Sequence, residues 1–325
     1  MTSLAQVTAL VDAHVQHDNA RFRAVTLQIA ANLAARSERG ADQLRKLVEH
    51  QPAQSFTPLP SASGLLSSPP ELALLDDMVL AGVIRERLDR GILEHAQRDV
   101  GFVHRLRPAR KLLFTGPPGV GKTMAAGALA RAVDLPMFRV ELHEVIASHL
   151  GETAGKLAKV FEHVAAMPAV YLFDEFDAIG TDRGTNDGSS AGAEMRRVVN
   201  SLLQFIEDDR SESLIVAATN HGHVLDHAIF RRFDEVISFT PPSKIEVIEL
   251  VRRTLVSVDI EQLDLDAIYT AAVAAKLGHA EVCVALERAL KDNVLAGTLI
   301  DTTRLIDGLA QRARFDAGAP AGVAA

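Results

Sequence analysis

Residues 116–123 read GPPGVGKT and fit the pattern G-x-x-x-x-G-K-[ST] of a phosphate-binding loop. Glycines let such a loop turn so that several backbone N–H groups point at one anion. Lys122 can then reach the β- and γ-phosphates of a nucleotide, and the Thr123 hydroxyl can hold Mg²⁺. The stretch predicts nucleotide binding; the alternative interpretation is a Gly/Pro turn with a chance lysine.

The sequence on either side of this loop fits a strand before it and a helix after it. The apolar run KLLFT at residues 111–115 ends at Gly116, as a buried parallel strand would. Residues 124–133 are rich in Ala and Leu and favour a helix, so bound phosphates would lie at a helix N-terminus. This context favours nucleotide binding over the chance turn.

The overall composition is that of a globular protein with two or three domains. The chain has 325 residues, of which 48% are hydrophobic and 23% charged. Its net charge of −8 provides no basic field for nucleic acid, so no nucleic-acid partner is expected. The single cysteine precludes an internal disulfide and suits a reducing compartment. Because the sequence shows neither a membrane span nor a signal peptide, we expect a cytoplasmic protein.

Five segments of different composition follow one another along the chain. Residues 1–50 favour helices but form too small a core to fold without a partner or another subunit. Residues 51–70 contain five prolines and no charged residue, which predicts an extended, mobile linker. Apolar strands alternate with helices over residues 71–242, and helices alone follow over residues 243–316. The Ala/Gly-rich residues 317–325 are predicted to fray.

The alternating segment predicts the architecture of the largest domain. Strands are expected at residues 112–114, 137–140, 170–173, 214–218 and 236–239, with helix-length stretches between them. Alternation of this kind implies βαβ units, a parallel sheet and helices on both faces. We therefore expect an α/β fold, namely a three-layer αβα core of P-loop type, with an all-α subdomain after it and a small helical segment before it.

Two acidic residues follow the third of these strands. The sequence VYLFDE at residues 170–175 places Asp174 and Glu175 at the carboxyl end of a buried strand, the edge where open α/β sheets bind ligands. Asp174 would hold Mg²⁺ directly or through water, and Glu175 would polarise the water that attacks the γ-phosphate. The alternative is a solvated helix cap, but the phosphate-binding loop about 50 residues earlier favours the catalytic interpretation.

An asparagine and two arginines accompany the next two strands. IVAATN at residues 215–220 reads as a strand that ends in Asn220, which could hydrogen-bond the γ-phosphate or the attacking water, although such an Asn is otherwise a turn residue. Arg231 and Arg232 precede the last strand and would ordinarily be solvated or ion-paired. An arginine that points across a subunit boundary could instead act as an arginine finger, worth roughly 10³–10⁵ in rate.

Residues 112–290 resemble the AAA+ ATPases of the AAA clade. The resemblance rests on GPPGVGKT, YLFDEFDAIG (171–180), AATN (217–220) and RRFDEVISF (231–239). It implies a Walker A motif, a Walker B motif, sensor 1, arginine fingers and a helical lid, together with ring hexamers whose sites lie between subunits. The implied catalytic residues are Lys122, Asp174, Glu175, Asn220, Arg231 and Arg232, and Thr123 and Asp174 are the implied metal ligands. Arg232 is the closer match to the arginine before Phe-Asp.

The same resemblance implies three sets of nucleotide contacts. In the loop they are Gly116, Pro117, Pro118, Gly119, Val120, Gly121, Lys122, Thr123 and Met124. In the lid they are Gly278, His279 and Ala280, which would flank the adenine. Before the core they are Met78 and Val79, which suit an apolar contact with the base.

Two stretches depart from the pattern of the clade. The arginines, usually spread over R-x-G-R, are adjacent here, so which one is the main finger stays open. The pore loop, usually aromatic–hydrophobic–glycine, reads His149, Leu150, Gly151. An imidazole grips less well than a larger aromatic ring and titrates near neutral pH. Threading of an extended polypeptide is therefore expected to be weakened.

Three functional interpretations follow from the sequence. The leading one is a Mg-ATP-hydrolysing ring that remodels a protein. The second is a nucleotide-gated assembly or regulatory module that threads no substrate, and the third, a clamp loader or helicase acting on DNA, is disfavoured by the acidic charge. The helical segment and proline linker resemble those of short bacterial AAA proteins. RVVN at residues 197–200 is weakly similar to the HORMA-remodelling pachytene checkpoint ATPases, so a HORMA-type protein or an associated protease system is a possible partner.

Three further features favour structural interpretations. His221, His223 and His227 do not have the spacing of a zinc site and lack a cysteine, so a loop-plus-cap role is expected. Residues 180–192 are rich in Gly and Ser and predict a second, mobile pore loop. Cys283 lies in an apolar helical stretch and is expected to be packed in the lid rather than reactive.

Overall fold

The computed structural model describes residues 25–26, 29, 62, 64–69, 72–98, 103–104, 106–146, 152–176, 190–222, 225, 227–256, 258, 260–298 and 300–316. The chain divides into two compact units, Met1–Ser55 and Phe56–Ala325. In the first unit Val25, Thr26 and Ile29 are helical, and the rest of the predicted helical segment lies outside the described residues. The second unit contains the β-sheet and the other described helices.

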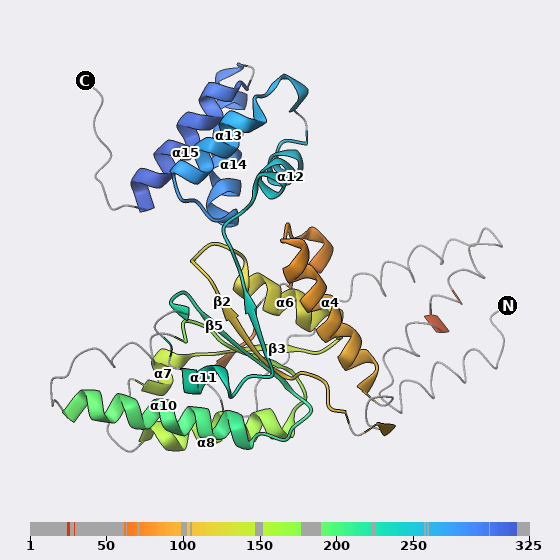
Figure 1. The fold of residues 1–325 in the computed structure, drawn as a ribbon, viewed down its shortest axis with the longest axis vertical. Coiled ribbons are helices and arrows are strands. Elements are labelled where there is room, and N and C mark those ends of the chain that lie inside the picture. Colours follow the sequence, from red (N-terminus) through yellow and green to blue (C-terminus); the bar gives the residue numbers. More distant parts are fainter. Residues whose placement is uncertain are drawn as a thin grey trace. The chain divides into compact units, whose positions relative to one another are not determined.

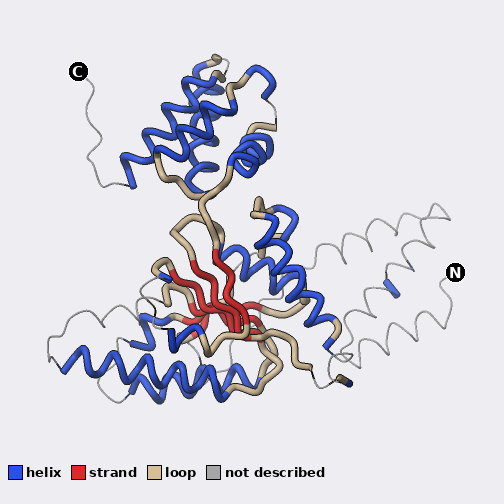
Figure 2. Tube along the Cα trace, in the orientation of Figure 1, coloured by secondary structure: helices blue, strands red, loops and turns tan. Residues whose placement is uncertain are grey.

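Five strands form a parallel sheet at the places where the apolar runs predicted them (Figure 1, Figure 2). They are β2 (Lys111–Thr115), β3 (Met137–Val140), β4 (Val170–Phe173), β5 (Leu214–Thr219) and β6 (Glu235–Ser238). The order in the sheet is β1-β3-β4-β5-β2-β6, and neighbours among the last five strands are parallel. Parallel neighbours need crossover connections, which the intervening helices supply. The predicted α/β fold is confirmed.

A sixth strand, β1 (Leu66–Ser67), lies within the range that the sequence predicted as an extended linker. It pairs antiparallel with β3, with Leu66 opposite Val140, and Leu65 O accepts a hydrogen bond of 2.9 Å from Glu141 N. Leu65 and Leu66 are both buried in the core of the second unit. Part of the proline-rich stretch therefore belongs to the sheet. Two residues are too short for a recognisable alternation of polar and apolar side chains, which is why the sequence did not predict this strand.

Helices cover both faces of the sheet, and each face has its own buried apolar cluster. On one face Leu88 of α4 and Leu129 of α6 pack with Phe114 of β2. On the other face Leu202 of α10 packs with Phe173 of β4, and Figure 1 shows α8 and α10 together on that side. The helices are α4 (Gly82–Ala96), α6 (Lys122–Ala132), α7 (Leu142–Ile146), α8 (Glu152–Ala166), α10 (Ser190–Asp208) and α11 (His227–Phe230). This gives the three-layer αβα core that the sequence predicted.

The described residues after β6 form helices only. They are α12 (Lys244–Thr254), the short 3-10 helix η5 (Ile260–Gln262), α13 (Leu265–Ala274), α14 (His279–Ala296) and α15 (Thr302–Asp316). The first helix begins in a capping box, in which Ser243 Oγ accepts from Glu246 N and the Glu246 carboxylate accepts from Ser243 N. We call this helical subdomain, from α12 to α15, the lid. Ile268, Val282 and Leu309 are buried in its apolar cluster.

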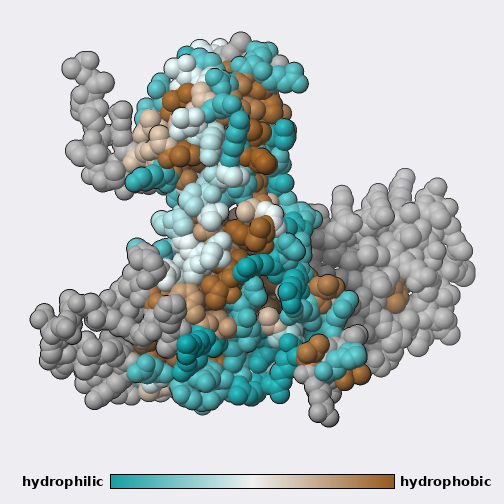
Figure 3. Space-filling model, in the orientation of Figure 1, coloured by the Kyte–Doolittle hydropathy of each residue, from teal (hydrophilic) through white to brown (hydrophobic). Residues whose placement is uncertain are grey.

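The lid leaves several large apolar side chains on its surface. Ile245, Val256 and Leu295 are 80%, 81% and 85% exposed, and Figure 3 shows apolar patches over the lid helices. Where such side chains form one contiguous patch, they are typical of surfaces that contact another protein.

Candidate functional site

The GPPGVGKT loop connects β2 to α6 in a conformation that requires glycine. Gly116 has a φ of 146°, and a Cβ built on it would lie 2.2 Å from the backbone oxygen of Phe239. Gly121 has a φ of 94° and is the N-cap of α6. A side chain at Gly116 would overlap the backbone, so the loop can pass this close to Phe239, the residue after β6, only with glycine there. The loop ends at the N-terminus of α6, as predicted, and a helix N-terminus favours a bound anion.

Lys122 is buried beneath the loop and is hydrogen-bonded in three directions. Its side-chain Nζ donates to Gly116 O and Pro117 O, both at 2.7 Å, and to Asn220 Oδ1 at 2.8 Å. The residue is only 7% exposed. An ammonium group has three N–H donors, so these three acceptors match its capacity. The loop lysine thus contacts the asparagine that follows β5.

Thr123 and Asp174 also form a direct pair. Thr123 Oγ1 donates to Asp174 Oδ2 at 2.9 Å, and Asp174 Oδ1 accepts from Glu175 N at 2.9 Å. Asp174 follows β4 and Thr123 lies in the first turn of α6. A hydroxyl and a carboxylate oxygen side by side are ligands of the type that Mg²⁺ takes. The residues present therefore fit a magnesium ion.

Glu175 has a backbone conformation that is rare for a residue with a side chain. Its φ is 52°, in the left-handed region, and its side chain is exposed. The chain turns here and continues into Phe176, which is buried and whose N–H donates to Ala218 O of β5 at 2.9 Å. Strained backbone of this kind gathers at functional sites, where surrounding structure holds it in place. The fixed turn directs the Glu175 side chain away from the core.

Arg231 and Arg232 lie side by side after α11, and the structure distinguishes them. Arg232 Nε is 2.7 Å from Glu207 Oε2 of α10, so this arginine is ion-paired within its own chain. Arg231 is exposed. The sequence analysis did not anticipate the role of Glu207, because nothing in a helical stretch indicates that one acid will meet a distant arginine.

The predicted lid and base-contact residues lie around the same loop. Ala280 N donates to Gly119 O at 2.9 Å, which joins the first turn of α14 to the loop. Met78 is buried, with its Cε within 3.3 Å of a Cβ built on Gly121. Val79 packs against the apolar cluster of the lid. Met124, in the first turn of α6, is 45% exposed.

His279 is paired with an acid of the lid. Its Nε2 is 3.9 Å from Glu246 Oε1, and the two side chains are 12% and 8% exposed. Burial alone would raise the pKa of the Glu246 carboxyl, but the nearby His279 imidazole and the hydrogen bond from Ser243 N outweigh it and lower that pKa to about 2. Glu246 is therefore ionised throughout the neutral range, and His279 has a fixed anion as its neighbour.

Other predicted residues lie outside the described part of the chain or have structural surroundings. His149, Leu150 and Gly151 lie outside the described residues, as do residues 180–189 of the second predicted pore loop and His223. Within the described ranges no group of three or more His, Cys, Asp or Glu side chains could hold a metal ion, and no helix is long and apolar enough to cross a membrane. Cys283 packs against the lid cluster, and burial raises the pKa of its thiol.

A further residue near the site was absent from the sequence analysis. Arg139 of β3 has its Nη2 3.7 Å from Asp174 Oδ2. A signal was available, because MFRV has a charged residue at one position of an otherwise apolar strand next to the strand that ends in Asp174.

Comparisons with known proteins agree with this geometry. The family model described as "ATPase family associated with various cellular activities (AAA)" matches residues 112–241. The chain is 40% identical over 233 residues to the AAA family ATPase y4kL of Sinorhizobium fredii, which covers 68% of this chain and 69% of the relative.

Two longer relatives match over a smaller share of their length. The peroxisomal ATPase PEX6 of Saccharomyces cerevisiae is 30% identical over 234 residues, which are 65% of this chain and 22% of that protein. A 26S proteasome regulatory subunit homolog of Methanothermobacter marburgensis is 33% identical over 171 residues, which are 52% of this chain and 44% of that one. The chain thus spans less than half the length of each.

A solved structure shares the fold. The crystal structure of the FIGL-1 AAA domain superposes with a TM-score of 0.57 at 21% identity, covering 78% of this chain and 86% of that one.

Proposed function

The chain belongs to the AAA family of ATPases, and from this premise we propose that it hydrolyses ATP with Mg²⁺ in a ring of identical subunits, a hexamer, that remodels or unfolds a protein partner. The observation that supports the proposal most is the meeting of two pairs at one edge of the sheet. Lys122 contacts Asn220 and Thr123 contacts Asp174, although the members of each pair are 98 and 51 residues apart.

Each of these residues has a proposed part in hydrolysis. Lys122 binds the β- and γ-phosphates, and Thr123 and Asp174 hold Mg²⁺, which when bound neutralises phosphate charge. Glu175 accepts a proton from the attacking water, and Asn220 orients that water or the γ-phosphate. The exposed Glu175 side chain on its fixed backbone turn suits a group that must face a ligand rather than the core.

The rest of the nucleotide would be bound by the loop, the lid and the segment before α4. The backbone of residues 116–124 surrounds the phosphates, and Gly278, His279 and Ala280 flank the base on one side, with Met78 and Val79 on the other. The hydrogen bond between Ala280 and Gly119 supports this, because it joins the lid to the phosphate loop.

A ring is supported by the arginines and by the lid surface. Because Arg232 is already paired with Glu207, we assign the arginine finger to the exposed Arg231, with Arg232 fixing the backbone beside it. Each Arg231 then stabilises the negative charge of the transition state at the nucleotide site of the neighbouring subunit. The exposed apolar side chains of the lid offer a surface for that neighbour.

The protein partner is proposed by class only. The first 50 residues select it, and a HORMA-type protein or a protease-associated substrate fits the similarities of the sequence; the proteasome-subunit homolog among the relatives supports the second. The proposed place of action is the cytoplasm. The alternative function is a nucleotide-gated assembly module that threads nothing, which is favoured by His149 in place of a larger aromatic residue.

The ATPase assignment is tested with Glu175→Gln, which keeps the side-chain size and removes the base. We expect the variant to bind ATP with normal affinity, to turn over at less than about one hundredth of the normal rate, and to accumulate as a ring in sedimentation experiments. The matched control is Glu162→Gln, an exposed glutamate of α8, which should behave like the unmodified protein. Normal turnover in Glu175→Gln would overturn the assignment.

The finger assignment is tested with Arg231→Ala and Arg232→Ala. We expect both variants to bind ATP, and Arg231→Ala to lose the larger part of the turnover. Mixing Arg231→Ala with Glu175→Gln subunits should restore some turnover, because the intact finger and the intact base then meet across one interface. No restoration together with a monomeric protein would contradict the shared site.

The partner and the mode of action are tested with the ATP-trapped Glu175→Gln protein. Proteins captured by the full chain and lost on removal of residues 1–55 are candidate partners. Substitution of His149 and Leu150 then separates the two functions: loss of remodelling with ATPase retained supports threading, and unchanged remodelling supports the gated module.

A further inference from the structure

Arg139 places a positive charge on the face of the sheet that is covered by the phosphate-loop helix. Successive side chains of a strand point to opposite faces. Phe138 and Val140 belong to the cluster under α8 and α10, whereas Met137 belongs to the cluster under α6. Arg139 therefore points to the α6 face, where its parallel register partner is Leu172 of β4, a member of the same cluster as Met137.

The guanidinium contacts the oxygen of Asp174 that also contacts Thr123. Arg139 Nη2 is 3.7 Å from Asp174 Oδ2, and Thr123 Oγ1 is 2.9 Å from that oxygen. The second oxygen, Oδ1, accepts from Glu175 N. The Asp174 side chain is 16% exposed and that of Arg139 is 44% exposed. The arginine thus lies on the side of Asp174 that the proposed metal ion would use.

We propose that Arg139 is a positioning residue that neutralises Asp174 when Mg²⁺ is absent and thereby sets how much Mg²⁺ the protein needs. The inference rests on the proposed function and adds a determinant of metal use to the same site. An arginine stays charged at every physiological pH, so it competes with a cation for the carboxylate without any change of its own protonation. Mg²⁺ must then take the carboxylate oxygen from the guanidinium.

Removal of the Arg139 charge is expected to weaken the binding of metal-free nucleotide and to strengthen the binding of Mg²⁺. Without Arg139, the carboxylates of Asp174 and Glu175 repel the phosphates of metal-free nucleotide more strongly, so metal-free binding weakens. The same uncompensated carboxylates attract Mg²⁺ more strongly, so less Mg²⁺ is required. If Arg139 only supported the fold, its replacement would weaken metal-free nucleotide binding and Mg²⁺ binding together. The opposite movement therefore distinguishes an electrostatic role from a structural one.

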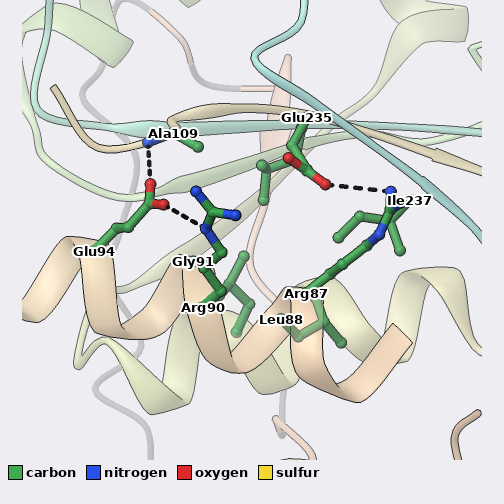
Figure 4. A pocket seen from close by; sticks show the side chains of 10 residues that line it. Arg87, Leu88, Arg90, Gly91, Glu94, Ala109, Glu235 and Ile237 are labelled. Atoms are coloured by element: carbon green, nitrogen blue, oxygen red, sulfur yellow. Dashed lines mark hydrogen bonds and ion pairs between the residues drawn. The ribbon is translucent and has the colours of Figure 1, made fainter. Parts of the chain in front are cut away.

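The experiment measures binding of the non-hydrolysed ATP analogue AMP-PNP by calorimetry, in EDTA and across a titration of Mg²⁺, for the full chain. The neutral variants are Arg139→Met and Arg139→Gln, and Arg139→Lys keeps the charge. The control is Arg87→Met, because Arg87 of α4 is 46% exposed, close to the 44% of Arg139, and lies 3.2 Å from Glu235 (Figure 4). Glu235 begins β6, so this pair lies at the opposite ends of the parallel strands from Asp174.

For the neutral variants we expect the Kd in EDTA to rise by about two- to fivefold and the half-saturating Mg²⁺ concentration to fall by a similar factor, which is the range of a partly exposed ion pair. Arg139→Lys should recover most of both values, and Arg87→Met should change neither. Parallel changes in the two quantities, or no change in folded Arg139 variants, would overturn the role of Arg139 while leaving nucleotide binding intact. An unmodified chain that does not bind AMP-PNP would overturn the proposed function and this inference together.

Discussion

Lys122 Nζ donates a hydrogen bond of 2.8 Å to Asn220 Oδ1, and this contact joins the phosphate loop to the end of the neighbouring strand. The contact follows from the register of the sheet. Strands β2 and β5 are parallel neighbours with Thr115 opposite Thr219, so the residues that follow each of them emerge side by side. Gly116 N donates to Thr219 O at 3.3 Å and continues the same ladder.

Asn220→Ala and Asn220→Asp are expected to separate the effect of this side chain on ATP hydrolysis from its effect on ATP affinity. The alanine variant loses an acceptor but adds no charge, so it should bind ATP nearly normally and hydrolyse it on the order of tenfold to a hundredfold more slowly. The aspartate variant forms a charged pair with Lys122 and repels phosphate, so its ATP affinity should also fall. Calorimetry and steady-state turnover give the two values; equal affinities in the two variants would contradict this contact.

Gly116→Ala is expected to destabilise the protein by about 3 kcal/mol or more, because it combines a left-handed φ with overlap against Phe239 O. The control is Gly155→Ala in α8, where nothing lies within 4 Å of a built Cβ. A helical glycine replaced by alanine should stabilise by about 0.5–1 kcal/mol. Urea denaturation measures both, and a Gly116→Ala protein as stable as the unmodified one would show that the loop can relax.

Among inactive variants at Glu175, the order of stability is expected to follow how well each residue type tolerates the left-handed backbone conformation. Because φ is 52°, Glu175→Gly and Glu175→Asn should be more stable than Glu175→Ala by about 1 kcal/mol, while all three lose turnover. The same series at Glu162 of α8 should give the reverse order, with alanine about 1 kcal/mol above glycine. Thermal denaturation tests this, and identical orders at the two positions would show that the Glu175 turn is not held in place.

The lowered pKa of the Glu246 carboxyl leads us to expect a loss of stability in acid. Its pKa of about 2 in the folded lid lies below the ordinary value of 4.5, so the ionised form stabilises the fold above pH 4.5. That stabilisation is lost as the pH falls from 4.5 toward 2. Glu246→Gln should therefore cost on the order of 2 kcal/mol at pH 7 and progressively less in acid.

The measurement for Glu246 is the free energy of unfolding of both proteins at pH 7, 4 and 3. Glu249→Gln serves as the control, because Glu249 is a partly exposed partner of Arg252 and Arg253 on the same helix. Its effect should be small at every pH. A difference between Glu246→Gln and the unmodified protein that grows as the pH falls would contradict the sign of the shift.

The sequence allowed the sheet, and the positions of Asp174 and Asn220 after two of its strands, to be predicted because both depend on local patterns. Apolar runs that end in polar residues located β4 and β5, and the topology of parallel strands then brought Asp174 and Asn220 to one edge. What could not be predicted depends on long-range contacts. Arg232 meets Glu207, and Arg139 meets Asp174, only after the helices and strands have packed.

In the described part of the chain, each edge of the sheet is contacted by another segment of the same chain. On the outer side of β3 the chain supplies its own two-residue strand β1, too short to template a foreign segment. On the outer side of β6, the backbone oxygen of Val236 already accepts from Arg87 Nη1 at 2.7 Å. In the proposed ring, we therefore expect subunits to join through helices, loops and side chains rather than by pairing of strands.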